Sequence, residues 1–222
     1  RIIAALFILK VLFGIGYGLI NYYILDGRDS FVYFKSGGRI FNTIFDNPGH
    51  YLRLTFGPNG GVPPGDLTYI IDRFHENWYN TGSYTLIRFN SILHIFSLSN
   101  YYVHTVFMSF LSFTGLIGVL RMFTNIDNNK QVLFIISIFF IPSALFWGSG
   151  MHKDGLTIFG LGIFLLNFHH LTVMPFSKKR FLFLIASGAL IFLIREYLLV
   201  ILMPNLAGYF CVMKKPKFGF YK

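Results

Sequence analysis

Three groups of ionisable residues interrupt the apolar runs of this chain, and their types suit proton transfer and anion binding. A carboxylate takes a proton from a hydroxyl group, whereas a lysine or the planar guanidinium of an arginine binds phosphate. Ionisable residues within apolar stretches are costly and usually face a cavity or an opposite charge. The groups are Asp26 with Asp29, then His152, Lys153 and Asp154, and last Arg195 with Glu196.

Asp26 and Asp29 directly follow the first apolar run. One interpretation is a charged, solvated exit of the chain from a membrane. The other is a carboxylate held at the membrane surface, where it accepts a proton from an acceptor hydroxyl. The residues alone leave both interpretations open.

The second group stands between two apolar runs, with Gly148, Gly150 and Gly155 around it. One interpretation is a polar turn between helices with an interfacial salt bridge. The other is a phosphate site, because glycines let the backbone approach a ligand and the N-terminus of the next helix favours an anion. In that site Lys153 holds the phosphate, His152 donates to it, and Asp154 or Ser149 caps the helix.

Arg195 and Glu196 interrupt the last apolar stretch. They are either a self-neutralising pair that ties helices together or a functional pair. In the functional interpretation Arg195 binds a lipid phosphate through its planar fork, and Glu196 orients it or contacts the acceptor. Their positions adjacent in sequence point them about 100° apart on a helix, which favours another anionic partner for Arg195, either a bound phosphate or Asp154.

The sequence holds little that suits a metal or cofactor. Asp72, His75 and Glu76 share a helical spacing and are either ordinary solvated side chains or half of a metal site. A glycine-rich nucleotide loop, a zinc pattern and a nucleophile elbow are all absent from the sequence. Cys211 is the single cysteine. We therefore expect no metal, no cofactor and no disulfide.

The elements that position these groups are membrane helices. The chain has 222 residues, of which 54% are hydrophobic and only 13% are charged. Soluble domains have about 25% charged residues, and runs of about 20 apolar residues cross bilayers. The net charge of +10 lies largely at the ends of apolar runs, where it reports topology and gives no reason to expect nucleic acid.

These runs predict an all-α, polytopic transmembrane bundle with about six crossings. The last two form a hairpin within Phe181–Met213, and a single broken helix over that stretch is the alternative. We expect one transmembrane domain over residues 1–222, as a fragment of a longer chain. The predicted crossings are Ile2–Leu25, Tyr101–Phe123, Val132–Trp147, Leu156–Val173, Phe181–Ile194 and Tyr197–Val212.

The short basic loops predict the orientation. Lys178–Arg180 and Lys214–Lys217 favour the cytoplasm. Counting crossings from them places all three ionisable groups on the outer face, together with a long extracytoplasmic loop over residues 26–100. Within that loop, Ser30 onward and Ser83–Leu98 have helical apolar spacing and are expected to form interfacial helices.

This layout resembles the GT-C superfamily of integral membrane glycosyltransferases, which includes protein O-mannosyltransferases and the lipid A aminoarabinose transferase. The resemblance lies in the topology and in "DSFVY", Asp29 to Tyr33, where an acidic residue opens the first outer loop and an aromatic follows; Ser30 stands where the family has a second acidic residue. The stretch "PSALFWGSGMHKDGL" also resembles bacterial multi-pass proteins of cell-surface polysaccharide functions.

The resemblance implies transfer of a sugar from a polyprenyl-phosphate donor to a glycan, lipid or protein acceptor, in a bacterial inner membrane. It implies Asp29 as the catalytic base, with Asp26 as the competitor, and Tyr33 beside the substrate. Lys153 and Arg195 are then expected to bind one phosphate together. The rival hypotheses are a permease or flippase subunit for polysaccharide precursors and a surface-polysaccharide polymerase.

Overall fold

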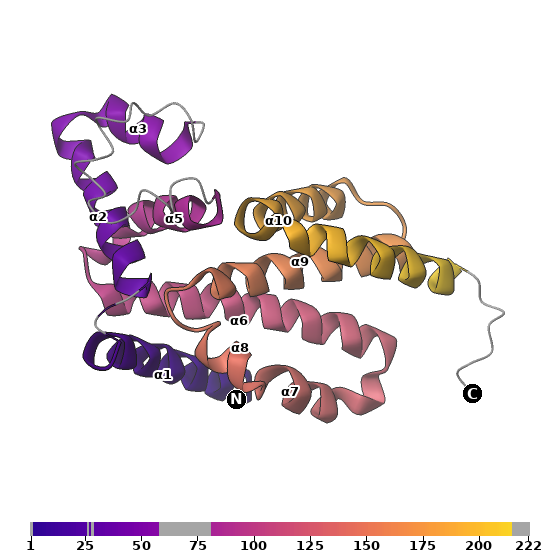
Figure 1. Cartoon of the computed structure of the whole chain (residues 1–222). Coiled ribbons are helices and arrows are strands. Elements are labelled where there is room, and N and C mark those ends of the chain that lie inside the picture. The colour runs from indigo at the N-terminus through magenta and orange to yellow at the C-terminus, as the bar shows by residue number, and fades with distance from the viewer. Residues whose placement is uncertain (1, 26, 28, 58–80, 215–222) are drawn as a thin grey trace.

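The computed structural model describes residues 2–25, 27, 29–57 and 81–214, and the described residues form helices and no strand. The helices pack as a bundle with a smaller group of helices across one end (Figure 1). The all-α prediction is confirmed for this part of the chain. The helices are α1 Ile2–Tyr23, α2 Asp29–Asp46, α3 Pro48–Phe56, α5 Thr81–Ser97, α6 Tyr101–Ile126, α7 Gln131–Phe139, α8 Pro142–Phe146, α9 Lys153–Val173 and α10 Lys178–Lys214.

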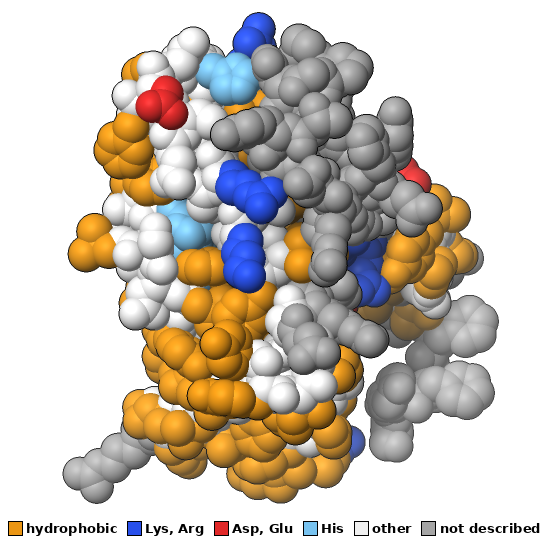
Figure 2. Space-filling model, turned by 60° about the vertical axis from the view of Figure 1, so that its left-hand side comes forward, with side chains coloured by type: hydrophobic (Ala, Val, Ile, Leu, Met, Phe, Trp, Pro, Cys, Tyr) orange, Lys and Arg blue, Asp and Glu red, His pale blue; other side chains and the backbone are white. Residues whose placement is uncertain are grey.

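Four of the described helices, α1, α6, α9 and α10, are long and apolar enough to cross a membrane. Large apolar side chains point outward along them, as Leu12 and Leu182 do with 59% and 68% of their area exposed. Figure 2 shows hydrophobic side chains, in orange, covering the lower part of one face of the molecule. Such exposure is costly in water and favourable in lipid. The coarse prediction of a membrane-embedded helical bundle is therefore supported.

The closest helix packing joins α6 to α9, which run side by side in the same direction. Gly162 of α9 lies against the backbone of Gly115 and Gly118, and a Cβ added to it would overlap the Gly115 carbonyl oxygen. Small residues let membrane helices approach until their backbones touch. Nearer the start of α9, Gly155 lies against the methyl group of Met108 on α6. The first turn of α9 therefore lies beside Met108.

The third apolar run is a broken element. Helix α7 ends at Phe139, and Pro142 opens the five-residue helix α8 after an extended Ile141. A proline excludes helical backbone at the preceding residue and lacks an N–H, so the helix cannot continue through it. The predicted crossing Val132–Trp147 is therefore two short helices that lead into a loop, residues 147–152.

That loop and α8 are fixed by side chains from two other helices. Lys10 of α1 is 0% exposed and donates to the Ala144 carbonyl over 2.8 Å. Ser109 and Ser112 of α6 donate to the carbonyls of Ser149 and Gly148. Carbonyls at the end of a helix lack intrahelical partners, and at membrane depth they must find them in the protein. These bonds hold the non-helical segment inside the bundle.

Helix α10 folds back on itself. Arg195 has non-helical backbone angles, φ −149° and ψ 80°, in the middle of the element. Arg195 bonds Asp154 at the start of α9, whereas the Tyr209 hydroxyl lies 2.5 Å from His169 near the end of α9. A straight helix would carry Tyr209 about 20 Å away from Arg195 in the opposite direction. The chain therefore adopts the hairpin arrangement, with its two arms meeting at Arg195.

The two segments predicted as interfacial helices form α2 and α5, and α3, which was not predicted, follows α2 in the chain. Helix α2 lies across the end of the bundle where α1 ends and α6 begins (Figure 1). Its first turn is attached to α6, since Phe31 stacks on Tyr101 at 4.1 Å and Ser30 shares a hydrogen bond of 3.0 Å with the Tyr101 hydroxyl. The Tyr84 hydroxyl of α5 donates to the Leu54 carbonyl of α3 over 2.6 Å. We call this end of the molecule the site end.

Substitution of Gly162 by leucine should separate α6 from α9, because the new side chain meets backbone that cannot rotate away. We expect Gly162→Leu to lower the free energy of unfolding by about 3 kcal/mol. Gly208→Leu is the matched control, since nothing lies within 4 Å of a Cβ there. Thermal unfolding of the two purified variants measures the difference. Equal stability of both variants would contradict the proposed packing.

Candidate functional site

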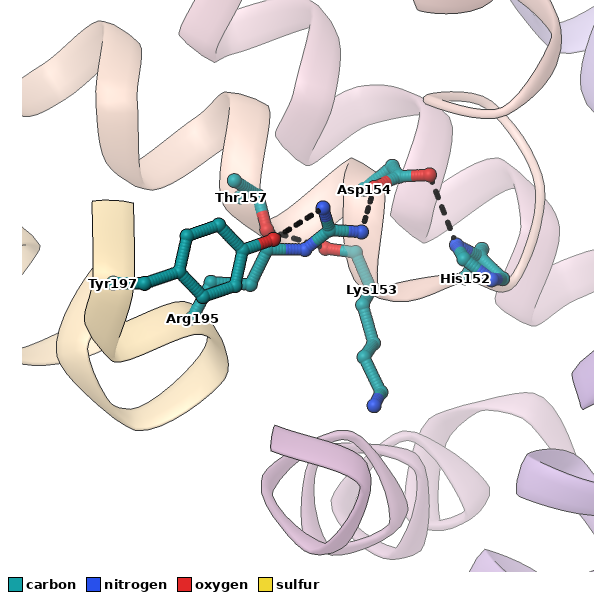
Figure 3. Close-up of polar contacts among 6 residues, drawn as sticks. All are labelled: His152, Lys153, Asp154, Thr157, Arg195 and Tyr197. Atoms are coloured by element: carbon teal, nitrogen blue, oxygen red, sulfur yellow. Dashed lines mark hydrogen bonds and ion pairs between the residues drawn. The ribbon is translucent and has the colours of Figure 1, made fainter. Parts of the chain in front are cut away.

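The polar side chains of the site end meet where α9 begins and α10 bends (Figure 3). Arg195 forms an ion pair through Nη2 with the Asp154 carboxylate, and its Nη1 donates to the Tyr197 hydroxyl over 3.1 Å. The other Asp154 oxygen lies 3.0 Å from Nδ1 of His152. The carboxylate is therefore held from both sides.

The local sequence explains why these groups meet. Residues Gly148 to Met151 are buried, and Gly150 packs so closely on the Tyr17 ring that a Cβ would overlap it. The loop can therefore turn sharply against α1, and α9 starts at Lys153, directly after His152, whose backbone is extended. Asp154 then falls in the first turn of α9, where the helix dipole favours a negative charge. The bend in α10 brings Arg195 to the same place.

The site is a partly exposed corner. The side chains of Arg195 and Asp154 keep 30% and 29% of their area exposed, and His152 keeps 19%. An ion pair with this exposure is neither fully solvated nor sealed from a ligand. Of the partners expected for Arg195, the structure contains Asp154. The self-neutralising pair with Glu196 is absent, and the exposed Glu196 makes no ion pair among the described residues.

Lys153 lies in the same turn of α9 but is directed elsewhere. Figure 3 shows its side chain pointing away from the Asp154–Arg195 pair. Its backbone carbonyl accepts a hydrogen bond of 2.9 Å from Thr157. Lys153 and Arg195 thus both lie near the start of α9, with their cationic groups facing different directions. That the two bind one phosphate together stays a prediction.

The predicted acidic group at the start of α2 is placed only in part. Asp29 is the first residue of α2. The side chain of Asp29 and the whole of Asp26 lie outside the described residues, as do Asp72, His75 and Glu76. No group of three metal-binding side chains occurs among the residues that the structure does describe.

One hydrophobic cluster connects the predicted site elements. It contains Tyr33 of α2, Leu156 of α9 and Ile194 of α10, all at least 95% buried, together with Met108 of α6. Tyr33 stands four residues after Asp29, Leu156 two after Asp154, and Ile194 directly before Arg195. The start of α2, the start of α9 and the bend of α10 therefore surround one core.

A buried network of two histidines lies beside this core and was not among the predicted site residues. His94 of α5 is 3.1 Å from the Phe34 carbonyl, so its Nε2 donates and its Nδ1 accepts from Ser99 over 3.2 Å. His104 donates from Nδ1 to Asn90 over 3.1 Å, and its Nε2 accepts from Ser97. Every ring nitrogen has a partner when both rings are neutral. Burial lowers the pKa of His94, which favours this neutral state.

Lys10 is a third residue that lies outside the predicted set. Lys10 is a charged residue within the first apolar run, as Arg195 is within the last. A charge in such a run needs a polar partner, so this position could have been recognised from the sequence. Its observed partner is the Ala144 carbonyl, which the sequence could not identify because the break at Pro142 creates that acceptor.

Comparisons of the chain with protein families, curated proteins and solved structures find no match. The geometry of the site end is therefore the basis for assigning a role.

Removal of either charge from the Asp154–Arg195 pair should destabilise the site end, because the remaining charge loses its partner in a half-buried place. We expect Asp154→Ala and Arg195→Ala each to lower the free energy of unfolding by about 1.5–3 kcal/mol. Glu196→Gln, which changes an exposed neighbour, is the matched control. The exchanged variant Asp154→Arg with Arg195→Asp should recover stability, measured by thermal unfolding. Single variants as stable as Glu196→Gln would show that the pair contributes nothing.

Proposed function

We propose that this protein is a six-crossing membrane glycosyltransferase that moves a sugar from a polyprenyl-phosphate donor to an acceptor on the outer face of a bacterial inner membrane. The observation that carries the proposal is the convergence of the α2 start, the α9 start and the α10 bend around one core. In the proposal, the carboxylate of Asp29 from the first turn of α2 works beside the cationic corner formed by Arg195. The resemblance of "DSFVY" and of the topology to GT-C enzymes supports the same role.

In this mechanism the acceptor oxygen bonds to the anomeric carbon of the sugar while the bond from that carbon to the phosphate oxygen breaks. Asp29 takes the acceptor proton, and polyprenyl phosphate leaves with the bonding electrons. A phosphate leaving group needs positioning and charge stabilisation more than covalent chemistry. The protein is thus required to hold three things: the acceptor, the sugar and the phosphate.

Arg195 is the proposed phosphate ligand, with His152 as a further donor. Lys153, which points away from Arg195 in Figure 3, is proposed to join them by turning its side chain toward the phosphate. Two nitrogens of Arg195 are oriented by Asp154 and Tyr197, and part of the side chain stays exposed. A guanidinium that is fixed before the ligand arrives loses little freedom on binding. Asp154 acts as the resting counterion of Arg195, and Glu196 and Asp26 are proposed to contact the acceptor or the sugar.

The lipid tail of the donor is proposed to lie along α10 beside Arg195. Phe192 and Val200 stand on either side of the bend, with 56% and 72% of their area exposed. Apolar side chains that face lipid next to a phosphate site are the surface that a polyprenyl chain would follow.

A permease or flippase subunit is the second candidate. It is favoured by charged groups at membrane depth, since Lys10 and Arg195 both lie within apolar helices. A polymerase of surface polysaccharide would share the chemistry of the first proposal. Transfer in detergent separates the enzymes from a transporter, because transport needs two compartments and transfer needs none.

Purified full chain in detergent should transfer sugar from a radiolabelled polyprenyl-phosphate donor to an acceptor, and Asp29→Asn should slow turnover about 10²–10⁴-fold with donor binding unchanged. Asp46→Asn, at the other end of α2, is the matched control and should keep full activity. The labelled product is counted after chromatography. Near-normal turnover by Asp29→Asn would move the base to Asp26 or Glu196, and absence of transfer across donors would favour the transporter.

The six-crossing topology predicts that positions 153 and 195 face outside and position 178 faces inside. Single cysteines at these positions, in a Cys211→Ser background, should react with a membrane-impermeant maleimide in that pattern. Whole cells and inverted vesicles provide the two sides. Labelling of positions 153 and 178 from the same side would end the proposed architecture.

A further inference from the structure

Basic residues of three helices lie at the end of the bundle opposite the site end. Asn125 of α6 donates from Nδ2 to Nε2 of His170 on α9 over 3.1 Å. Arg121 precedes Asn125 by one turn on α6, and Arg180 lies in the first turn of α10, seven residues after the end of α9. Lys178 and Lys179 precede Arg180 in the first turn of α10. We call Arg121, His170 and Lys178–Arg180 the basic end.

The basic end has no carboxylate of its own. Among the residues that the structure describes, Arg121, Lys178, Lys179 and Arg180 form no ion pair. The nearby Asp127 is bonded to Lys130 over 3.2 Å. Like charges held close together repel, and an anion from outside the described fold would relieve that repulsion.

The surface beside the basic end is apolar and exposed. Phe176 has 70% of its area exposed and packs against Phe181, which has 47% exposed, with ring centroids 5.8 Å apart. Val173, at the end of α9, is 56% exposed. A cationic cluster that adjoins apolar side chains on a membrane helix matches a ligand with an anionic head and hydrocarbon chains.

We propose that the basic end binds the phosphate headgroup of an anionic phospholipid, with Arg121 and Arg180 as its principal ligands and the acyl chains against Phe176 and Phe181. Basic pockets between membrane helices take such headgroups. This site lies at the opposite end of α9 from Arg195 and does not rest on the proposed function.

Membrane topology alone would not require this arrangement. The rule that basic loops stay inside needs lysine and arginine near the ends of crossings, in any mutual arrangement. Here the Asn125–His170 bond joins the end of α6 to the end of α9. Arg121 lies one turn before that bond on α6, and Arg180 lies in the first turn of α10, which follows α9. The bond from Asn125 fixes that imidazole as an acceptor at Nε2, which leaves its Nδ1–H as a further donor for a phosphate oxygen.

The test is binding of dioctanoyl phosphatidylglycerol to the purified full chain in a neutral detergent, measured by native mass spectrometry against dioctanoyl phosphatidylcholine. The wild-type chain should prefer phosphatidylglycerol at least about tenfold, and 0.5 M salt should abolish that preference. Arg121→Gln with Arg180→Gln should weaken binding of phosphatidylglycerol about 10–100-fold. Lys130→Gln, which removes a cation already paired at this end, should change it less than about twofold.

Arg121→Lys with Arg180→Lys keeps the charge and should keep the preference for phosphatidylglycerol, which covers the case in which the glutamine variant fails to fold. Equal binding of the two lipids by the wild-type chain would overturn the proposal. So would a loss in Lys130→Gln as large as that in the double variant. Displacement of phosphatidylglycerol by inorganic phosphate at the same concentration would assign the site to free phosphate and reject the lipid.

Discussion

The fold depends on how the free carbonyls of the broken third apolar run find donors inside the bundle. Pro142 interrupts the helix, so Ala144, Gly148 and Ser149 present oxygens that no turn of helix satisfies. The ammonium of α1 and two hydroxyls of α6 supply the donors. Without these bonds the loop could not stay at membrane depth, because each unpaired carbonyl in lipid costs several kcal/mol. The loop sets where α9 begins, and thus where Asp154 stands.

A second constraint fixes the other half of the candidate site. The glycine contact between α6 and α9 sets the register of the two parallel helices, and the bend in α10 then brings its side chains to both ends of α9. Arg195 and Tyr209 are the two points of attachment. A single helix, α9, therefore connects the site end to the basic end. Its first turn carries the Asp154–Arg195 ion pair, whereas its last turn lies beside basic residues.

Much of this organisation could be predicted from residue patterns, and the exceptions have physical causes. Apolar runs, the helices at Ser30 and Ser83, and the reversal at Arg195 follow from hydropathy and interrupting charges. The partner of Arg195 was one of two that the sequence left open, since the choice between Asp154 and a ligand depends on three-dimensional register. Sequence reasoning missed three buried residues, Lys10, His94 and His104. Their hydrogen-bond partners are carbonyl and hydroxyl oxygens, which are so common along a chain that no sequence pattern identifies the ones that pair. Transfer chemistry at Asp29 remains a prediction.

The level at which α9 begins has a consequence for the surrounding bilayer. Its first residue stands beside Met108, about two turns inside the start of α6, and the apolar part of the first α10 arm, residues 181–194, spans about 21 Å. A hydrocarbon layer is about 30 Å thick. Hydrophobic mismatch of this kind draws the lipid surface inward along one flank of a protein. Lipid headgroups next to α10 would therefore lie closer to the level of Arg195. A charged lipid could then bind the guanidinium laterally while its acyl chains stay in the bilayer.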